Sequence, residues 1–420
     1  MKKTLLVVSA AFLCISSMNA QDQKRTRQCA THEHNAELMS KDSQFKANYD
    51  RLNAEAAEVD ANPSLNKVTN IVTIPVVAHV LWKTQTQNIV DAKIFAQIEQ
   101  LNQDYSATNT DTNLVPAVFK PLIANSQIQF CLAKRDPQGN PHTGINRVQT
   151  TKSSFGSSND AKFTSQGGVD AWPRDSYLNL WICNLGGGLL GYAQFPGGAA
   201  NTDGVVVLYS SIGSIANPGS FSPYNLGRTT THEVGHWLNL RHIWGDSNCG
   251  NDFVSDTPVQ QSSNFGCPSF PKITCSNGPN GEMFMNYMDY VDDDCMNMFS
   301  IGQGARMNLL FNPNNGTRKA LLTSLGCVPA SINEISDAAE IMSIFPNPSS
   351  GIFNLSFMAG NIRQFEVEVH NLVGQKVFST QEKAFTNSNY QLDLSSLKKG
   401  VYNMLFSTEG KIYTKRISIQ

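Results

Sequence analysis

The chain has 420 residues, of which 16% are charged and 40% hydrophobic, and its formal net charge is −2. This length suffices for two or more domains with a sizeable core. A net charge so close to zero argues against nucleic acid or an anionic membrane surface as the main partner.

The first 20 residues have the pattern of a secretory signal peptide. Two lysines precede an apolar run over residues 5–15, and residues 18–20 form a small-residue cleavage site. Because the apolar run is too short to span a bilayer, we expect no transmembrane segment and a secreted mature protein. Of the nine cysteines, one (Cys14) lies in this segment, so eight remain that could form disulfides after export.

Residues 21–65 are polar and charged and carry few large apolar side chains. This composition predicts a prosegment rather than a domain. We place the prosegment at 21–50, with its end no later than about residue 65.

From Val68 the sequence predicts regular elements. Runs rich in β-branched residues predict strands over 71–81, 126–134, 177–184 and 204–209. Apolar residues at helical spacing predict a helix over 91–104. Together with an irregular segment that follows, they predict an α+β domain over 51–328, in which a twisted sheet and a helix precede an irregular C-terminal subdomain.

The sequence His232-Glu233-Val234-Gly235-His236, followed by His242, has the residue types of a zinc site. If residues 229–239 form a helix, His232 and His236 lie one turn apart on one face and can bind one Zn²⁺. His242 would be the third ligand, and Glu233 could accept a proton from the attacking water.

The chain must turn sharply between the second and third histidines. The zincin signature H-E-x-x-H-x-x-G-x-x-H has a glycine at the turn, where this chain has Asn239. Asn tolerates the left-handed backbone conformation better than most residues, so the turn can still form.

A secreted adhesin or binding protein with a structural metal site is the alternative function. Closed structural zinc sites usually include Cys, whereas this one combines three His with a carboxylate. The sequence therefore favours a hydrolytic enzyme.

Four cysteines lie between His242 and residue 300, in a segment rich in Gly, Pro, Asn and Ser. We expect two disulfides there, and the spacing leaves their connectivity open. Cys131 and Cys183 lie in strand-like runs and could be bridged or simply buried thiols.

The C-terminal part of the chain has a different pattern. Residues 329–340 form a polar linker, and residues 341–420 contain short alternating segments separated by Gly, Asn and Ser turns. This pattern predicts a small antiparallel sandwich of the immunoglobulin-like kind.

Several phrases resemble the pappalysin family of metzincin zinc proteases across most of residues 70–328: IPVVAHVLW, LNLWICNLGGGLLGYAQFPG, HEVGHWLNLRHIWG, NDFVSDTP, FGCP and MNYMDY. The resemblance implies a metzincin catalytic domain with one catalytic Zn²⁺. It also implies a secreted endopeptidase that acts on proteins and peptides and is made as a latent zymogen.

The resemblance assigns roles to residues after the histidines. Met288 would be the Met-turn methionine beneath the zinc site, and Tyr290 would stabilise the oxyanion, although both residue types are also common in packing. Asp294 resembles the acidic residue of a pocket that selects Arg, or less strongly Lys, at P1′, the position after the scissile bond. The alternative for Asp294 is a solvated acidic loop.

The same resemblance implies the disulfides Cys249–Cys275 and Cys267–Cys295. It also implies a structural Ca²⁺ held by Asp252, Asp256 and Thr257, since oxygen-rich loops suit that ion. Asp residues at turns equally often serve as local caps.

Cys29 lies in Arg27-Gln28-Cys29-Ala30-Thr31, which resembles the family's R-x-C-G-T cysteine switch with Ala in place of Gly. A thiolate on the fourth zinc position would keep the zymogen inactive. The alternatives are a disulfide to Cys131, Cys183 or Cys327, or an inert thiol. We expect activation by cleavage within 45–65, first at Asp50-Arg51, which an Arg-preferring enzyme could cut itself.

The tail contains IFPNPSSG at 344–351 and ends in KGVYNMLFSTEGKIYTKRISIQ. These phrases resemble the C-terminal sorting domain of the type IX secretion system of Gram-negative bacteria. The resemblance implies that the secretion machinery is a partner and that the enzyme crosses the outer membrane, to be released or attached to the cell surface. The alternative is an accessory carbohydrate-binding or adhesion sandwich.

Overall fold

The computed structural model describes residues 26–61, 71–329, 342–357, 364–371, 375–382, 389–408 and 411–420. The predicted signal peptide and residues 330–340 of the predicted linker lie outside these ranges. Among the described residues, no helix is both long enough and apolar enough to cross a bilayer.

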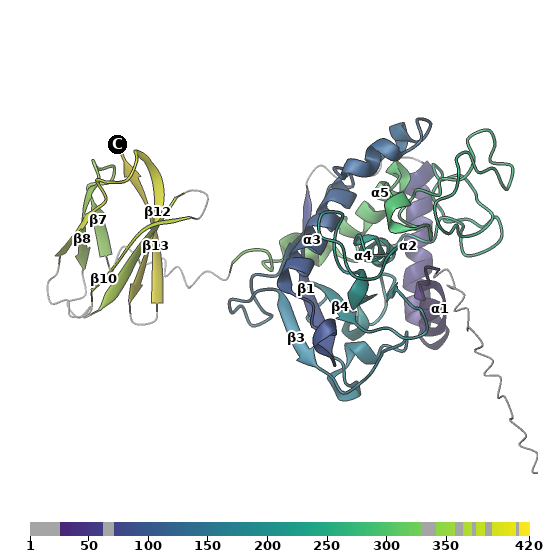
Figure 1. The fold of residues 1–420 in the computed structure, drawn as a ribbon, viewed down its shortest axis with the longest axis horizontal. Helices are drawn as coiled ribbons and strands as arrows, with labels where there is room; N and C mark the ends of the chain where they lie inside the picture. Colours follow the sequence, from purple (N-terminus) through teal and green to yellow (C-terminus); the bar gives the residue numbers. More distant parts are fainter. Residues whose placement is uncertain are drawn as a thin grey trace, which may run out of the picture.

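The catalytic domain is built on a six-stranded sheet (Figure 1). Its order is β2-β1-β4-β6-β5, and β3 pairs with the second half of β1. All pairs are parallel except β5–β6, so β5 is an antiparallel edge strand. The strands are β1 (Val72–Trp82), β2 (Ile128–Leu132), β3 (Ile145–Gln149), β4 (Leu178–Cys183), β5 (Gly191–Ala193) and β6 (Val205–Leu208).

The four predicted strands correspond to β1, β2, β4 and β6, whereas β3 and β5 were not predicted. β3 (INRVQ) is only half-buried and mostly polar, so it lacks the apolar pattern that marks the other strands. β5 has three residues and lies in a glycine-rich stretch that favours a loop.

Two helices pack on one face of the sheet. α3 (Asp91–Ser106) is the helix predicted over 91–104, and α4 (Arg228–Trp237) carries the histidine motif. Alternate residues of β1, such as Ile74 and Val76, share one core cluster with Ile98 of α3 and Val234 of α4. This packing fixes α4 beneath the edge strand.

The irregular segment after α4 is held to the domain by disulfides and by one further helix. The structure pairs Cys249 with Cys275 and Cys267 with Cys295, as the resemblance implies. A third disulfide, Cys131–Cys327, closes the end of the domain onto β2, while Cys29 and Cys183 are buried free thiols. The unpredicted helix, α5 (Ile301–Asn308), is capped by Ser300, whose hydroxyl accepts a hydrogen bond from the backbone N–H of Gln303.

The predicted prosegment forms two helices along one flank of the catalytic domain, drawn in purple in Figure 1. They are α1 (Thr31–Lys41) and α2 (Ser43–Ala61). The boundary predicted between residues 50 and 51 falls in the middle of α2. α2 also packs along α5, and its Leu52 belongs to the core cluster of the catalytic domain.

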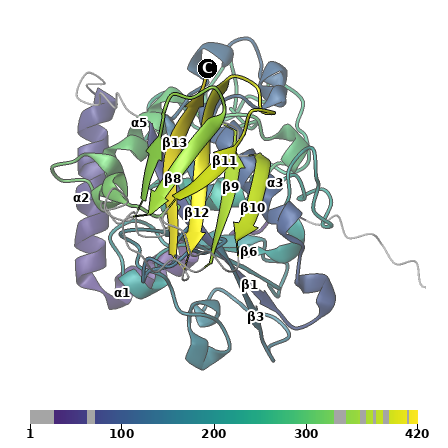
Figure 2. The ribbon, with the colours of Figure 1, turned by 90° about the vertical axis from the view of Figure 1, so that its left-hand side faces the viewer.

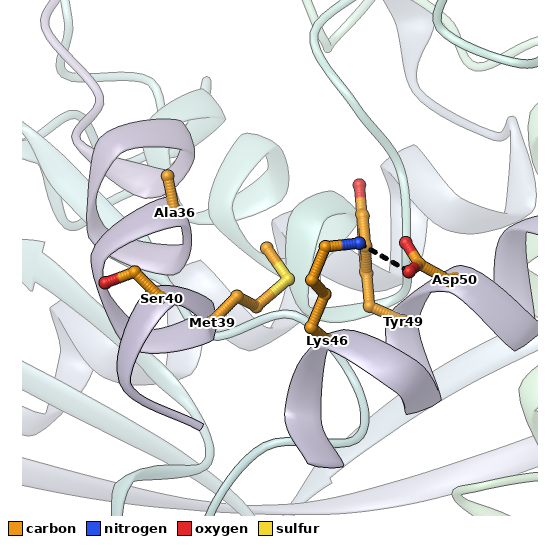
Figure 3. A pocket seen from close by; sticks show the side chains of 6 residues that line it. All are labelled: Ala36, Met39, Ser40, Lys46, Tyr49 and Asp50. Carbon is orange, nitrogen blue, oxygen red and sulfur yellow. Dashed lines mark hydrogen bonds and ion pairs between the residues drawn. The ribbon is translucent and has the colours of Figure 1, made fainter. Parts of the chain in front are cut away.

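A cavity of about 380 Å³ lies between α1 and α2 (Figure 3). Its lining residues are Ala36, Met39, Ser40, Lys46, Tyr49 and Asp50. Lys46 and Asp50 form an exposed ion pair at 2.6 Å, one helical turn apart.

The C-terminal domain is an antiparallel sandwich, as predicted, and several of its strands are labelled in Figure 2. One sheet has the order β10-β9-β12-β13 and the other β11-β8-β7. Burial alternates along β8 and β9, so every second side chain enters the shared core. The strands are β7 (Met342–Phe345), β8 (Ile352–Phe357), β9 (Phe365–His370), β10 (Lys376–Glu382), β11 (Asn389–Asp393), β12 (Gly400–Thr408) and β13 (Lys411–Ile419).

Candidate metal centre and the cleft around it

The three histidines of the motif meet at one point. His232 and His236 lie one turn apart on α4, and their Nε2 atoms are 3.1 Å apart. α4 ends at Trp237, and Asn239 takes φ 75°, the left-handed conformation expected of it. The turn brings His242 Nε2 to 3.1 Å from His236 Nε2.

The hydrogen bonds of these rings show what the centre can hold. The Nδ1 atoms of His232 and His236 bond to the carbonyl oxygens of Tyr287 and Leu240 at 2.7 and 2.8 Å, and His242 Nδ1 bonds to the Asp246 carboxylate. A carbonyl oxygen only accepts, so Nδ1 carries the proton and the Nε2 lone pairs face one another. Three converging lone pairs in a buried site fit a metal cation and repel one another without it.

Met288, the residue predicted to form the Met-turn, packs against α4 at Gly235, between the two histidines. Met288 is fully buried and belongs to the same core cluster as Val234 of α4. A Cβ added at Gly235 would lie 2.6 Å from the Met288 sulfur. Gly235 is therefore the residue that lets the methionine approach the helix between the two histidines.

Glu233 lies beside the histidines and under the edge strand. A Cβ at Gly191 of β5 would lie 2.7 Å from Glu233 Cγ, so only glycine leaves room for this carboxylate. Burial raises the pKa of Glu233 to about 7, against hydrogen bonds from Thr31 and Cys29 that favour the ionised form. A carboxyl group in this position can accept and return a proton near neutral pH.

Tyr290 reaches the centre from the segment after Met288. Its hydroxyl is 3.1 Å from His242 Nε2 and donates a hydrogen bond to the Cys29 carbonyl oxygen at 3.2 Å. The hydroxyl is thus directed at a peptide carbonyl beside the metal-binding atoms.

Cys29 of the prosegment completes a four-membered group. Its Sγ and the imidazole nitrogens of His232, His236 and His242 all lie within 4.8 Å of one another. The neighbouring Thr31 donates a hydrogen bond to Glu233 Oε2 at 2.9 Å. Of the alternatives for Cys29, a disulfide to Cys131, Cys183 or Cys327 is excluded in this structure.

Arg27 fills a buried pocket two residues before Cys29. Its guanidinium bonds to Asp293 Oδ1 at 2.5 Å, and neither side chain has any exposed surface. The ring of Tyr224 lies 5.0 Å from the guanidinium carbon. Asp294, the residue predicted to select basic side chains, is instead exposed and lies beside the Cys267–Cys295 disulfide.

The prosegment also pairs with the backbone of the edge strand. Leu190 N donates to Gln28 O at 2.9 Å, and Ala30 N donates to Gly191 O at 3.1 Å. The chain around Cys29 therefore occupies the cleft as an added strand, the mode in which extended peptides bind to exposed sheet edges.

Asn35 continues this pairing with its side chain. The carboxamide donates to Ala193 O and accepts from Phe195 N, both at 2.8 Å. An amide side chain thus replaces a peptide group at the edge of the sheet, although α1 has already turned away from it. The sequence carries no pattern that could have identified this residue.

The predicted calcium ligands separate into two groups. Thr257 Oγ1 lies 3.0 and 2.9 Å from the two Asp252 carboxylate oxygens and 2.8 Å from Val254 O. Asp256 points elsewhere, accepting from Ser300 Oγ at 2.6 Å and Gly302 N at 2.7 Å at the start of α5. Asp256 therefore caps the start of α5, which fits the alternative use of turn aspartates.

Asp246 and Asp293 were not singled out from the sequence, although both contact site residues. Asp246 lies four residues after His242, a spacing that could have indicated a carboxylate supporting the third histidine. Asp293 lies in the run Asp292-Asp293-Asp294, and only the fold decides which of the three is buried.

Comparisons with known proteins give two matching families. A sequence model of the pregnancy-associated plasma protein-A family matches residues 163–312. A second one, described as a secretion system C-terminal sorting domain, matches residues 343–420.

Three relatives are similar over 61–70% of the chain. Mature mirolysin of Tannerella forsythia, solved with a cleaved peptide, is 48% identical and covers 61% of this chain and 97% of its own, with a TM-score of 0.59. A promirolysin mutant from the same organism is 44% identical, covering 70% and 97%, with a TM-score of 0.63. An extracellular metalloprotease of Pyricularia oryzae is 34% identical over 263 residues, 61% of this chain and 80% of the relative.

Proposed function

The chain belongs to the pregnancy-associated plasma protein-A family of metallopeptidases, and we propose that it is a zinc endopeptidase made as a latent zymogen. It is a metalloendopeptidase with an extracellular destination, and its C-terminal domain is a sorting domain of the type IX secretion system. The observation that carries the proposed latency is the convergence of Cys29 Sγ and three imidazole nitrogens within 4.8 Å.

His232, His236 and His242 would hold the zinc ion. When bound, zinc supplies Lewis acidity, which polarises the scissile carbonyl and makes the attacking water more acidic. Glu233 accepts the proton of that water and returns it to the leaving amine nitrogen. The Tyr290 hydroxyl donates a hydrogen bond to the oxyanion, as it does here to the Cys29 carbonyl oxygen.

In the latent form the prosegment engages each of these groups at once. The Cys29 thiolate would be a further ligand of the zinc ion, Thr31 donates a hydrogen bond to Glu233, and the Cys29 carbonyl accepts the hydrogen bond of Tyr290. A substrate can enter only when this segment leaves the cleft.

Arg27 supports a proposal about specificity. A fully buried ion pair with Asp293 in the latent cleft resembles the binding of a substrate arginine. We assign selection of Arg, and less strongly Lys, at P1′ to Asp293 rather than to the exposed Asp294.

Calcium is proposed at Asp252, Thr257 and the Val254 carbonyl. Burial raises the pKa of Asp252 to about 7, and no basic side chain is within hydrogen-bonding distance of this carboxylate among its described contacts. A cluster of oxygen atoms around a desolvated carboxylate suits Ca²⁺.

Activation is proposed to require cleavage within 45–65, of which residues 62–65 lie outside the described ranges. The first candidate, Asp50-Arg51, lies in the middle of α2, and Asp50 lines the cavity in Figure 3. Proteases bind extended chains, so cleavage there requires α2 to open first.

The activity test compares wild type with Glu233→Gln on a denatured protein substrate. We expect Glu233→Gln to retain the metal and to lower kcat by about 10²–10⁴-fold, because the proton acceptor is lost. A chelator should abolish wild-type cleavage. A Gln variant with full activity would contradict the assignment of Glu233.

The specificity test uses Asp293→Asn with Asp294→Asn as its matched control. On peptides with Arg at P1′, Asp293→Asn should lower kcat/KM on the order of 10²-fold, because a buried charge loses its partner. Asp294→Asn should leave it unchanged. The reverse result would restore Asp294 as the selector.

A further inference from the structure

A second pocket opens beside the metal centre, on the far side of His242. It has a volume of about 380 Å³ and is lined by Trp244, Asp246, Ser247, Asn248, Gln261 and Ser262. The Trp244 ring stacks on the His242 ring, with centroids 4.3 Å apart and planes 6° apart. The pocket is therefore directly continuous with the third metal-binding residue.

One wall of this pocket is the Asp246 carboxylate, and its outer oxygen, Oδ2, has two long contacts, with His32 and Arg241. Asp246 Oδ1 accepts from His242 Nδ1, and Oδ2 faces the prosegment, where His32 Nδ1 lies 3.3 Å away. Once the prosegment leaves, Oδ2 loses His32 and keeps only the 3.4 Å contact with Arg241, so it can accept from a substrate side chain that enters the pocket.

Arg241 is the second partner of this oxygen, and most of its guanidinium is engaged elsewhere. Its guanidinium donates to Asn251 O at 3.0 Å and to Gly245 O at 3.1 Å, and it lies against the ring of Phe253. Its contact with Asp246 Oδ2, at 3.4 Å, is the longest of these and beyond the ordinary range for a strong hydrogen bond.

The prosegment also indicates which side of the scissile bond this pocket serves. Arg27 occupies the proposed P1′ pocket, Cys29 lies at the metal, and His32 lies beyond Cys29 against Asp246. Asp246 is thus on the opposite side of the metal from Asp293. In a substrate, that side receives residues N-terminal to the scissile bond.

We propose that the pocket beside Trp244 and Asp246 is a subsite for a cationic side chain two or three residues before the scissile bond. In the zymogen His32 contacts the Asp246 carboxylate of this pocket. In the active enzyme a His, Lys or Arg of the substrate replaces His32. Trp244 adds an aromatic wall, which also favours a cation. This inference rests on the proposed function, because the P1′ assignment defines the direction of the substrate.

The test uses the enzyme after activation, with its C-terminal domain retained, and peptides with Arg fixed at P1′. His, Lys, Arg, Gln, Leu or Glu is placed in turn at P2 and at P3. At one of these positions a cationic residue should raise kcat/KM about fivefold over Gln, mainly through KM, as expected for a partly exposed ion pair. Equal kcat/KM values for all residues at both positions would overturn the subsite.

A pair of variants locates the effect without touching Asp246, which supports a metal ligand. Gln261→Lys places a cation at the exposed edge of the pocket. Gln129→Lys makes the same change at an exposed residue of β2, which lies at the edge of the sheet opposite β5. Only Gln261→Lys should remove the preference for cationic residues. A preference that survives Gln261→Lys would overturn this location.

A third peptide set separates this inference from the proposed function. It replaces Arg by Gln at P1′ while P2 and P3 stay unchanged. If Arg at P1′ is preferred but P2 and P3 have no effect, the subsite alone is overturned. If no peptide shows a P1′ preference, the substrate direction is lost and both proposals are overturned.

Discussion

At the scale of single residues, the metal centre depends on groups that fix the orientation of its ligands. Each histidine ring is held by an acceptor at Nδ1, and two of these acceptors are backbone carbonyls that no substitution can remove. Asp246, the acceptor for His242, is the exception. The centre can therefore be weakened selectively at one residue.

We predict that Asp246→Asn lowers zinc affinity about 10–100-fold, because an amide supports the His242 ring less well than a carboxylate. Competition with a chromophoric chelator in the Glu233→Gln background measures this affinity. Asp294→Asn, a change of the same kind at an exposed position, serves as the control. Equal affinities in the two variants would count against the role of Asp246.

Gly235 gives a second residue-scale prediction. Gly235→Ala should lower the free energy of unfolding by about 1–3 kcal/mol, because its Cβ would overlap the Met288 sulfur. Urea denaturation of the Glu233→Gln zymogen measures the loss. Gly156→Ala is the control, since its Cβ would meet no atom within 4 Å, and a similar loss in both would refute the close contact.

Sequence reasoning was strongest and weakest at this same scale. The histidines and Glu233 could be assigned from their spacing, because that spacing requires only one helix and one turn to bring them together. The resemblance assigned the P1′ pocket to Asp294, whereas the buried ion pair with Arg27 favours Asp293, because adjacent carboxylates look alike in sequence until burial distinguishes them. Asp246 could not be found from the motif, because its hydrogen bond to His242 spans a turn that lies beyond the motif.

At the scale of elements, the edge strand β5 and the helix α4 define the cleft together. β5 has only three residues, and its small Gly191 lets Glu233 rise beneath it. Such a strand has no apolar alternation, so the sequence predicted a loop. Its position depends on pairing with β6, which is a tertiary property.

Helix α1 was missed for a related reason. The buried side of α1 consists of polar residues, among them His34 and Asn35, which bind to the catalytic domain rather than to an apolar core. A hydrophobic pattern could not mark this helix. Helix α1 is therefore stabilised mainly by its contacts with the catalytic domain.

We predict that Asn35→Ala accelerates activation of the zymogen. The change removes both hydrogen bonds to Ala193 O and Phe195 N and leaves these buried backbone groups unpaired, at a cost of about 1–3 kcal/mol each. The time course of activation, followed by gel and peptide cleavage, measures the effect. Ser40→Ala on the exposed side of α1 should keep the wild-type rate, and equal rates for both would contradict the pairing.

At the scale of the whole molecule, the chain combines a catalytic domain, the two N-terminal helices of the proposed prosegment and a sandwich with its own core. The order of these parts could be predicted, because each has a distinct composition and pattern. The fit between prosegment and cleft could not, because it depends on contacts between residues more than 200 positions apart, such as Arg27 and Asp293.

We predict that deletion of residues 341–420 leaves peptidase activity intact and retains the enzyme in the periplasm. The sandwich shares no core cluster with the catalytic domain among the described residues, so its removal exposes no catalytic core. Fractionation of cells and culture medium, with activity measured in each, tests both parts. Secretion of the shortened enzyme at the wild-type level would contradict the sorting role.

The central claim is that Cys29 closes the metal centre of a latent enzyme, and X-ray absorption at the zinc edge tests it most directly. The intact Glu233→Gln zymogen should show three nitrogen ligands and one sulfur at about 2.3 Å. Cys29→Ser in the same background should lose the sulfur and keep the nitrogens. A zymogen spectrum without sulfur, or one unchanged by Cys29→Ser, would contradict the account.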